Sequence, residues 1–142
     1  MAAPRVLDAS LGQLLGQAQH ALHRDFDARV RAAGLSAPEW RVLAALHEEA
    51  PMTISQLAQT VLSKQPTVTK LVQRMAEQGW LMLAADASDQ RRTLVAPTAS
   101  GKRLARPLVL EAKEHEARVL RSLGATEKIA LRKLLGKLAQ HA

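Results

Sequence analysis

The sequence predicts a mainly α-helical chain with one small β-hairpin. Apolar residues recur at three- and four-residue spacing through most of its 142 residues, as expected for helices that bury one face. Two short apolar runs, residues 80–84 and 93–96, flank a charged, turn-prone segment at 86–92, which is the layout of a hairpin and its loop. A short helical segment, a brief turn and a longer helical segment come directly before that hairpin. These features predict a single domain over 1–142, in which a winged helix-turn-helix lobe at 35–97 is flanked by helices at 1–34 and 98–142.

Capping residues set the bounds of the first three predicted helices. An apolar stripe begins at Leu7 and continues to about residue 33, where Gly34 is placed to end the helix. Ser36 has a glutamate three residues later, and Thr53 has a glutamine at the same spacing. Both pairs have the form of a capping box, so they predict the starts of the second and third helices.

The fourth predicted helix extends from Lys64 to about Gln78, with Ser63 as its N-cap and Gly79 at its end. One face is apolar, and the other carries hydroxyl, amide and cationic groups that suit the base edges and phosphates of DNA. Taken alone, such a face is more often ordinary solvated surface. The candidate DNA-contacting residues of this segment are Ser63, Lys64, Gln65, Pro66, Thr67, Thr69, Lys70, Gln73 and Arg74.

The loop of the predicted hairpin, which we call the wing tip (residues 86–92), strengthens the expectation of DNA binding. It contains Asp86, Asp89, Arg91 and Arg92. Two free acids beside two arginines would repel phosphate, so we expect an aspartate to brace the turn and orient Arg91. An arginine held at such a tip fits the minor groove of DNA, whose negative potential attracts guanidinium.

The terminal helices carry more apolar surface than a winged helix of about sixty residues can cover. One is predicted from Thr98 to about Leu123, and the last from about Thr126 to the C-terminus. A second copy of the chain is the economical partner for these apolar seams, so the sequence predicts a homodimer.

Composition bounds the function further. The net charge of +7 favours a polyanionic partner, and the absence of cysteine excludes disulfides and thiolate metal sites. The chain has no 18-residue uncharged stretch and no signal-peptide layout, so we expect a cytoplasmic protein that does not bind membranes. It has no phosphate-binding glycine loop and no Ser/His/Asp arrangement, so we expect neither an enzyme nor a bound cofactor.

Candidate ligand-binding residues lie on the first two helices. Asp25 and Arg29 are four residues apart at the margin of the apolar stripe, so the favoured interpretation is an ion pair between them. The alternative is that Arg29 binds the carboxylate of a ligand. Five histidines also raise the alternative of metal sensing, but their spacing predicts no metal site, and His115 lies on an apolar seam. The candidate ligand-binding residues are His23, Arg29, Trp40 and His47.

The order and spacing of several short motifs resemble the MarR family of bacterial transcription regulators over nearly the whole chain. The motifs are Leu35-Ser-Ala-Pro-Glu-Trp-Arg-Val-Leu43, Ile54-Ser-Gln-Leu-Ala58, Pro66-Thr-Val-Thr-Lys-Leu-Val72, Gly79, Asp86-x-x-Asp89-x-Arg91 and Thr98-x-x-Gly101. Two features differ from the family pattern. The segment Met82-Leu-Ala-Ala85 before the wing tip is neutral where relatives often have basic residues, and Ala125 stands where the last helix often has a serine or threonine cap, which leaves Thr126 as the expected cap.

The resemblance implies a homodimer that places two winged helices on a palindromic operator in double-stranded DNA. It also implies a repressor, released by a small phenolic or aromatic carboxylate effector. By resemblance, Arg91 enters the minor groove and an aspartate braces it. Two alternatives stay open: a winged helix that binds a protein instead of DNA, and a metal-responsive regulator of the same fold.

Overall fold

The computed structural model describes residues 10–141. The chain divides into two compact units, one of residues 25–111 and one that combines residues 1–24 with residues 112–142. The predicted lobe at 35–97 lies wholly within the first unit. The predicted beginning of the first helix at Leu7 lies outside the described residues, within which α2 spans Leu11–Ala32.

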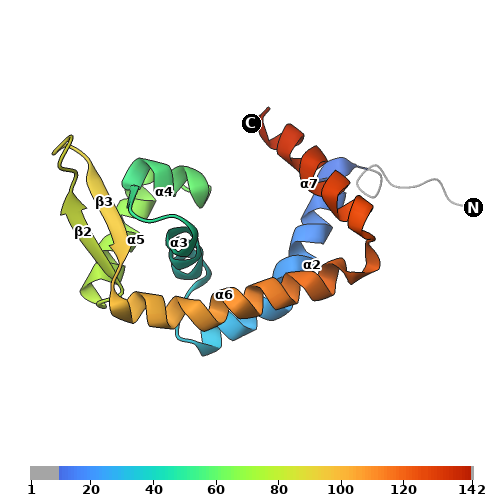
Figure 1. Cartoon of the computed structure of the whole chain (residues 1–142), viewed down its shortest axis with the longest axis horizontal. Helices are drawn as coiled ribbons and strands as arrows, with labels where there is room; N and C mark the ends of the chain where they lie inside the picture. Colours follow the sequence, from blue (N-terminus) through green and yellow to red (C-terminus); the bar gives the residue numbers. More distant parts are fainter. Residues whose placement is uncertain (1–9, 142) are drawn as a thin grey trace, which may run out of the picture. The chain divides into compact units, whose positions relative to one another are not determined.

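Three helices form the helical part of the unit of residues 25–111: α3 (Ala37–Glu48), α4 (Ile54–Thr60) and α5 (Gln65–Glu77). All three contact one another, and each also contacts the small sheet (Figure 1). Their apolar faces recur at the predicted helical spacing and supply most of the core. Its fully buried side chains include Val30, Val42, Leu43, Leu46, Leu57, Val68, Val72, Met75, Val95 and Leu108.

The sheet has three antiparallel strands in the order β1-β3-β2. The predicted hairpin is present as β2 (Leu81–Ala85) and β3 (Thr93–Pro97). The first and last residues of both strands lie within one residue of the predicted ones. The sequence analysis missed β1 (Met52–Thr53), which pairs with β3 through Met52 opposite Val95. Two residues carry too little alternation to predict a strand, and only the pairing with β3 defines this one.

The predicted capping boxes of α3 and α4 are confirmed. The Ser36 hydroxyl accepts from the Glu39 N–H at 3.3 Å, and the Glu39 carboxylate accepts from the Ser36 N–H at 2.8 Å. Thr53 and Gln56 exchange the same two bonds at 3.0 and 3.1 Å. Gly34 and Gly79 follow α2 and α5 with φ of 87° and 84°, the left-handed conformation in which glycine ends helices.

Helix α6 (Ala99–Val119) is fastened at its beginning to the turn that follows α5. The Thr98 hydroxyl donates to the Gly79 carbonyl at 2.6 Å and accepts from the Gly101 N–H at 3.1 Å. A side chain at Gly101 would overlap the Trp80 carbonyl oxygen. This close approach explains physically why the Thr98-x-x-Gly101 spacing occurs here.

The unit of residues 1–24 and 112–142 contains the first half of α2, the end of α6, the short 3₁₀ helix η1 (Leu120–Ser122) and α7 (Ala125–Ala139). Its helices α6 and α7 are joined by an Arg132–Glu116 ion pair of 3.1 Å. Helix α7 has no buried residue. The prediction of Thr126 as its cap is wrong, because Gly124 takes the N-cap position and donates its N–H to the Glu127 carboxylate at 2.8 Å.

Candidate nucleic-acid interface

Helix α5 has the two faces that its sequence predicts. Val68, Leu71, Val72 and Met75 are buried against the rest of the unit. Thr69 is half-buried, and the other candidate DNA-contacting residues from Ser63 to Arg74 are exposed. From Ser63 to Arg74 the outward face therefore offers hydroxyl, amide and cationic groups, which suit a polyanion, and the one acid of α5 is Glu77 at its last residue.

The prediction of Ser63 as the N-cap of α5 is wrong. Helix α4 ends in a Schellman motif, in which the Ser63 N–H donates to the Ala58 carbonyl at 2.9 Å and the Leu62 N–H to the Gln59 carbonyl at 3.3 Å. Because Ser63 completes the end of α4, α5 begins one residue later. Lys64 takes the N-cap position and makes no side-chain capping bond.

The wing tip is built on the carboxylate of Asp86. Its oxygen Oδ1 accepts from the backbone N–H of Ser88 at 2.9 Å and from the Ser88 hydroxyl at 2.8 Å. The backbone N–H of Asp86 donates across the loop to the Arg92 carbonyl at 3.0 Å. Asp86 therefore closes the turn, and the hydrogen bonds from Ser88 lower its pKa below the ordinary value of 3.8.

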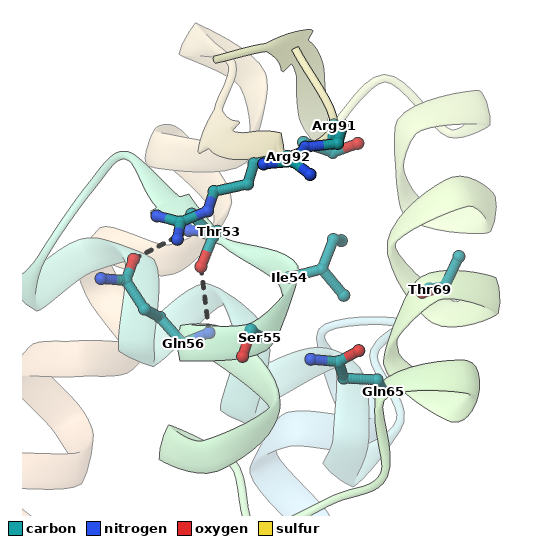
Figure 2. Close-up of a pocket in the computed structure, with 9 residues that line it drawn as sticks. Thr53, Ile54, Ser55, Gln56, Gln65, Thr69, Arg91 and Arg92 are labelled. Carbon is teal, nitrogen blue, oxygen red and sulfur yellow. Dashed lines mark hydrogen bonds between the residues drawn. The ribbon is translucent and has the colours of Figure 1, made fainter. Parts of the chain in front are cut away.

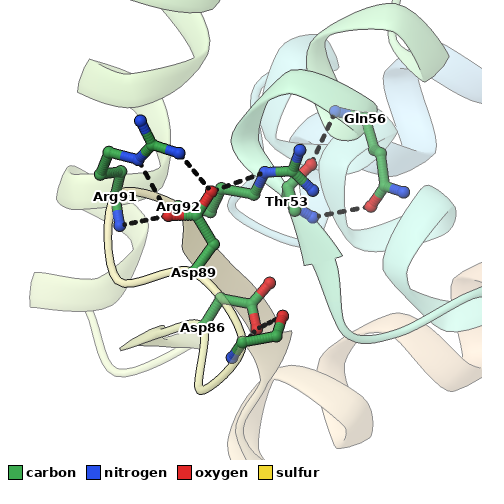
Figure 3. Close-up of polar contacts among 7 residues, drawn as sticks. Thr53, Gln56, Asp86, Asp89, Arg91 and Arg92 are labelled. Carbon is green, nitrogen blue, oxygen red and sulfur yellow. Dashed lines mark hydrogen bonds and ion pairs between the residues drawn. The ribbon is translucent and has the colours of Figure 1, made fainter.

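The carboxylate of Asp89 holds both arginines of the wing tip (Figure 3). Arg91 donates to it from the backbone N–H and from Nε, both at 3.1 Å. Arg92 Nε lies 3.6 Å from its other oxygen. The hydrogen bonds from Arg91 lower the pKa of Asp89, so this carboxylate is ionised at neutral pH and attracts both arginines. The expectation that an aspartate orients Arg91 agrees with this geometry, and the sequence analysis did not foresee that the same group holds Arg92.

A polar cleft of about 510 Å³ lies between the wing tip, α5 and the beginning of α4. Figure 2 shows the two arginines on one side of it and α5, with Gln65 and Thr69, on another. Gln65 and Thr69 are one helical turn apart, so both can face the same space. The cleft is lined by Thr53, Ile54, Ser55, Gln56, Gln65, Thr69, Arg91, Arg92 and Thr93.

The sequence analysis missed the contribution of α4 to this cleft. Thr53 and Gln56 were identified only as a capping box, although their positions also place polar groups at the start of α4 opposite Arg92. The sequence did contain a signal for this contribution, because the capping box at Thr53 marks the start of the first helix of the helix-turn-helix. An exposed helix N-terminus attracts anions. The other candidate residues of α5 lie outside the cleft, on the exposed face.

The strand that leads into the wing tip is apolar. Met82 and Leu83 of β2 are 55% and 37% exposed, and no cation lies on the strand. Strand β2 is also an edge strand, since β3 occupies the middle of the sheet. The cationic groups of the hairpin are therefore confined to Arg91 and Arg92.

The candidate ligand-binding residues do not gather around the cleft. Arg29 pairs with Glu111 across α2 and α6, with Nε 2.7 Å from Oε2, whereas the sequence analysis favoured Asp25 as its partner. Trp40 makes an edge contact with Phe26 at 5.5 Å between ring centroids. His47 and His23 are both exposed, and they belong to different units.

Two further features concern sites proposed from composition. His115 is buried, as expected for a histidine on an apolar seam. Within residues 10–141, no three His, Asp or Glu side chains are grouped so that they could hold a metal ion.

No helix of that range combines the length and apolar character needed to cross a membrane.

A helix-turn-helix followed by a two-stranded wing, with cations on both, defines the winged-helix class of DNA-binding proteins. A sequence model of the MarR family matches residues 33–92. A MarR family transcriptional regulator from Silicibacter pomeroyi DSS-3 has 34% sequence identity and a TM-score of 0.83, covering 95% of this chain and 99% of its own. The chain belongs to the MarR family of transcriptional regulators and is a DNA-binding winged-helix protein.

Two other relatives are similar over almost their whole length. The HTH-type transcriptional regulator FarR of Neisseria gonorrhoeae is 26% identical, over 93% of this chain and 90% of that protein. The crystal structure of NadR in complex with 4-hydroxyphenylacetate has 27% identity and a TM-score of 0.84, with 98% of each chain covered. FarR is a transcriptional regulator, which agrees with the expectation of a non-enzyme.

Proposed function

We propose that this regulator is a homodimer that binds a palindromic operator and represses transcription until a small aromatic carboxylate binds it. The observation that carries the DNA-binding part is the Asp89 carboxylate, which holds Arg91 and Arg92 at a cleft shared with Gln65 and Thr69 of α5. Cations held in advance lose less side-chain entropy on binding DNA than free ones. Two copies present two such surfaces, which match half-sites about 34–36 Å apart.

The two arginines have different tasks in this proposal. The Arg91 side chain is 90% exposed at the end of the tip, where it can enter the minor groove. The Arg92 side chain is 65% exposed and lines the cleft opposite Thr53 and Gln56, where it can bind a phosphate of the DNA backbone. The outward face of α5 then lies in the major groove and supplies base contacts through Gln65, Thr69 and Lys70.

Single substitutions separate these tasks. We expect Arg91→Ala to weaken operator binding by about 1–3 kcal/mol and to relax preference for base pairs under the wing. We expect Arg92→Ala to weaken binding about equally on all sequences and to reduce the slope of log K against log salt by about 1. The measurement is fluorescence anisotropy at several salt concentrations on the footprinted operator and on unrelated duplex. Arg118→Ala removes a cation from the exposed surface of α6 and is the control for loss of charge alone. Wild-type affinity and footprint in both wing variants would remove the wing from the proposal.

The effector part rests on the position of Arg29 and on the similarity to NadR, whose structure contains 4-hydroxyphenylacetate. Because Glu111 already holds Arg29 at 2.7 Å, a ligand carboxylate has to compete with it. If Arg29 receives that carboxylate, Glu111→Gln should tighten binding and Arg29→Ala should weaken it. Isothermal titration with 4-hydroxyphenylacetate and a panel of related acids measures the affinity of both variants. Trp40→Phe, His47→Ala and His23→Ala test the other three candidate ligand contacts in the same way. Unchanged affinity in the Arg29 and His47 variants would exclude this site.

A further inference from the structure

Leu62 combines a backbone conformation that costs folding free energy with a side chain that contributes almost nothing to folding. It lies in the turn between α4 and α5 with φ of 57°, a left-handed conformation that a residue with a Cβ adopts at a cost. Glycine is the usual residue at this place of a Schellman motif, because it has no Cβ. The leucine side chain is also 92% exposed, so packing within the chain returns almost nothing for it.

The position of Leu62 places it at the edge of the proposed DNA-binding surface. Lys64 is the N-cap of α5, and Gln65, the first residue of the helix, lines the cleft. In helix-turn-helix proteins, the N-terminal end of the second helix approaches the base edges. Leu62 lies two residues before that N-cap, in the turn that leads into this end of the helix.

We propose that Leu62 makes an apolar contact with the DNA where α5 enters the major groove. This inference rests on the proposed DNA-binding surface. The duplex offers two apolar groups of suitable size at that depth, the C5 methyl group of thymine and the face of a deoxyribose. The strained and exposed conformation is then offset in the complex, where the side chain leaves water.

The glycine variant separates the contact from the fold. Leu62→Gly removes the side chain and the strain together, so the thermal midpoint should not fall. Its affinity for a duplex that the wild-type protein selects from a random pool should weaken about tenfold, the change that burying about 55 Å² of apolar surface supplies. Leu62→Asn also accepts the left-handed conformation but is polar. It should lose affinity as glycine does, whereas Leu62→Met should keep most of it.

Deoxyuridine in place of each thymine of the selected duplex distinguishes the two apolar groups. If Leu62 contacts a thymine methyl group, one substitution weakens the wild-type protein and has no effect on Leu62→Gly. If it contacts a deoxyribose, no substitution does so, while Leu62→Gly weakens binding on every duplex. Wild-type affinity in Leu62→Gly, or full affinity in Leu62→Asn, overturns the inference even if Arg91→Ala and Arg92→Ala weaken binding. A wild-type protein that selects no duplex overturns the proposed DNA-binding surface itself.

Discussion

Among single residues, Asp89 has the largest influence on the wing, because its carboxylate accepts hydrogen bonds from Arg91 and forms an ion pair with Arg92. Its side chain is only 26% exposed, whereas the side chain of Arg91 is 90% exposed. Asp86 has a separate task, since its partners are the N–H and hydroxyl of Ser88. The wing tip therefore contains one acid that closes the turn and one that orients the cations.

This division predicts two titrations whose main causes are different residues, Ser88 for Asp86 and Arg91 for Asp89. The pKa values of Asp86 and Asp89 are both lowered in the folded protein. A lowered folded-state pKa contributes stability that is fully present above the unfolded value and is lost as pH falls through the folded value, so the wing tip should not change between about pH 8 and about pH 5. Carboxyl carbon shifts followed by NMR should give both midpoints below 3.8.

The two aspartates also serve as controls for each other. Arg91→Ala should move the Asp89 midpoint upward and leave Asp86 unchanged, since Arg91 supplies the largest effect on Asp89. Ser88→Ala should raise the Asp86 midpoint in part, because it removes the hydroxyl bond but keeps the backbone N–H bond, which has the largest effect on the pKa of Asp86. A common shift of both midpoints in either variant would mean that the tip titrates as one coupled group.

At the scale of secondary-structure elements, the beginning of α5 carries a cation at a position where a capping side chain would stabilise the helix. Lys64 has the extended conformation of an N-cap, with φ of −78° and ψ of 145°, but a lysine cannot accept the hydrogen bond that caps a helix. The position keeps a cation where a phosphate can approach. Natural proteins commonly leave such stabilising substitutions unused at functional sites.

Exchanging that lysine for a capping residue should therefore change stability and binding in opposite directions. Lys64→Ser should raise the free energy of unfolding by about 0.5–2 kcal/mol, because its hydroxyl can accept from the N–H of Thr67. It should also weaken DNA binding and its salt dependence, since one cation is lost. Lys64→Gln, which removes the charge and caps poorly, is the matched control for urea denaturation and anisotropy. If Lys64→Ser bound DNA as the wild type does, this cation would have no place in the interface.

The junction between the end of α5 and the start of α6 restricts which residue can stand at position 101. The Trp80 carbonyl accepts from the Thr98 N–H at 3.0 Å and occupies the space beside the α carbon of Gly101. The end of α5 and the start of α6 therefore form one rigid joint within the unit of residues 25–111.

Adding one methyl group at this joint should be destabilising. Gly101→Ala forces the added carbon against backbone, which cannot rotate away as a side chain can, so we expect a loss of about 1–3 kcal/mol or more in urea unfolding. Ser100→Ala changes an exposed residue in the same turn and should have little effect. Equal midpoints for the two variants would show that the joint relaxes without cost.

At the scale of the whole molecule, the terminal helices carry exposed apolar side chains that a lone chain leaves in water. Leu134 and Leu138 of α7 are 58% and 48% exposed, and Leu11 and Leu14 of α2 are 56% and 52% exposed. Apolar surface of this extent on neighbouring turns is typical of an interface between chains. It agrees with the predicted homodimer.

Charges on α7 should therefore dissociate the assembly. We expect Leu134→Glu with Leu138→Glu to convert a dimer into a monomer in sedimentation velocity, because each carboxylate would be buried without a partner. Operator affinity should fall with it, since the two half-sites are no longer bound by one particle. Lys137→Glu places the same charge on the same helix at a residue that is polar already. A monomeric wild-type protein would contradict the proposed dimer directly.

Local chemistry was enough to predict the helices, the hairpin and the position of the charged tip. Capping boxes and helix-ending glycines act over three to five residues, so their spacing is visible in the sequence of α3, α4 and α5. The limit of such reasoning was reached at Ser63. It has the right side chain for an N-cap, but it lies at the end of the Schellman motif of α4, and α5 begins after Lys64.

The sequence by itself therefore determined where most helices and the hairpin lie and which face of α5 meets solvent, because both depend on period and on bonds between near neighbours. Only the tertiary structure decided which of these groups lie together. The pairing of Arg29 with Glu111, the joining of β1 to β3 and the meeting of α4 with Arg92 all connect residues far apart in sequence. Such contacts arise from packing of whole elements, so no local pattern of residue types carries them.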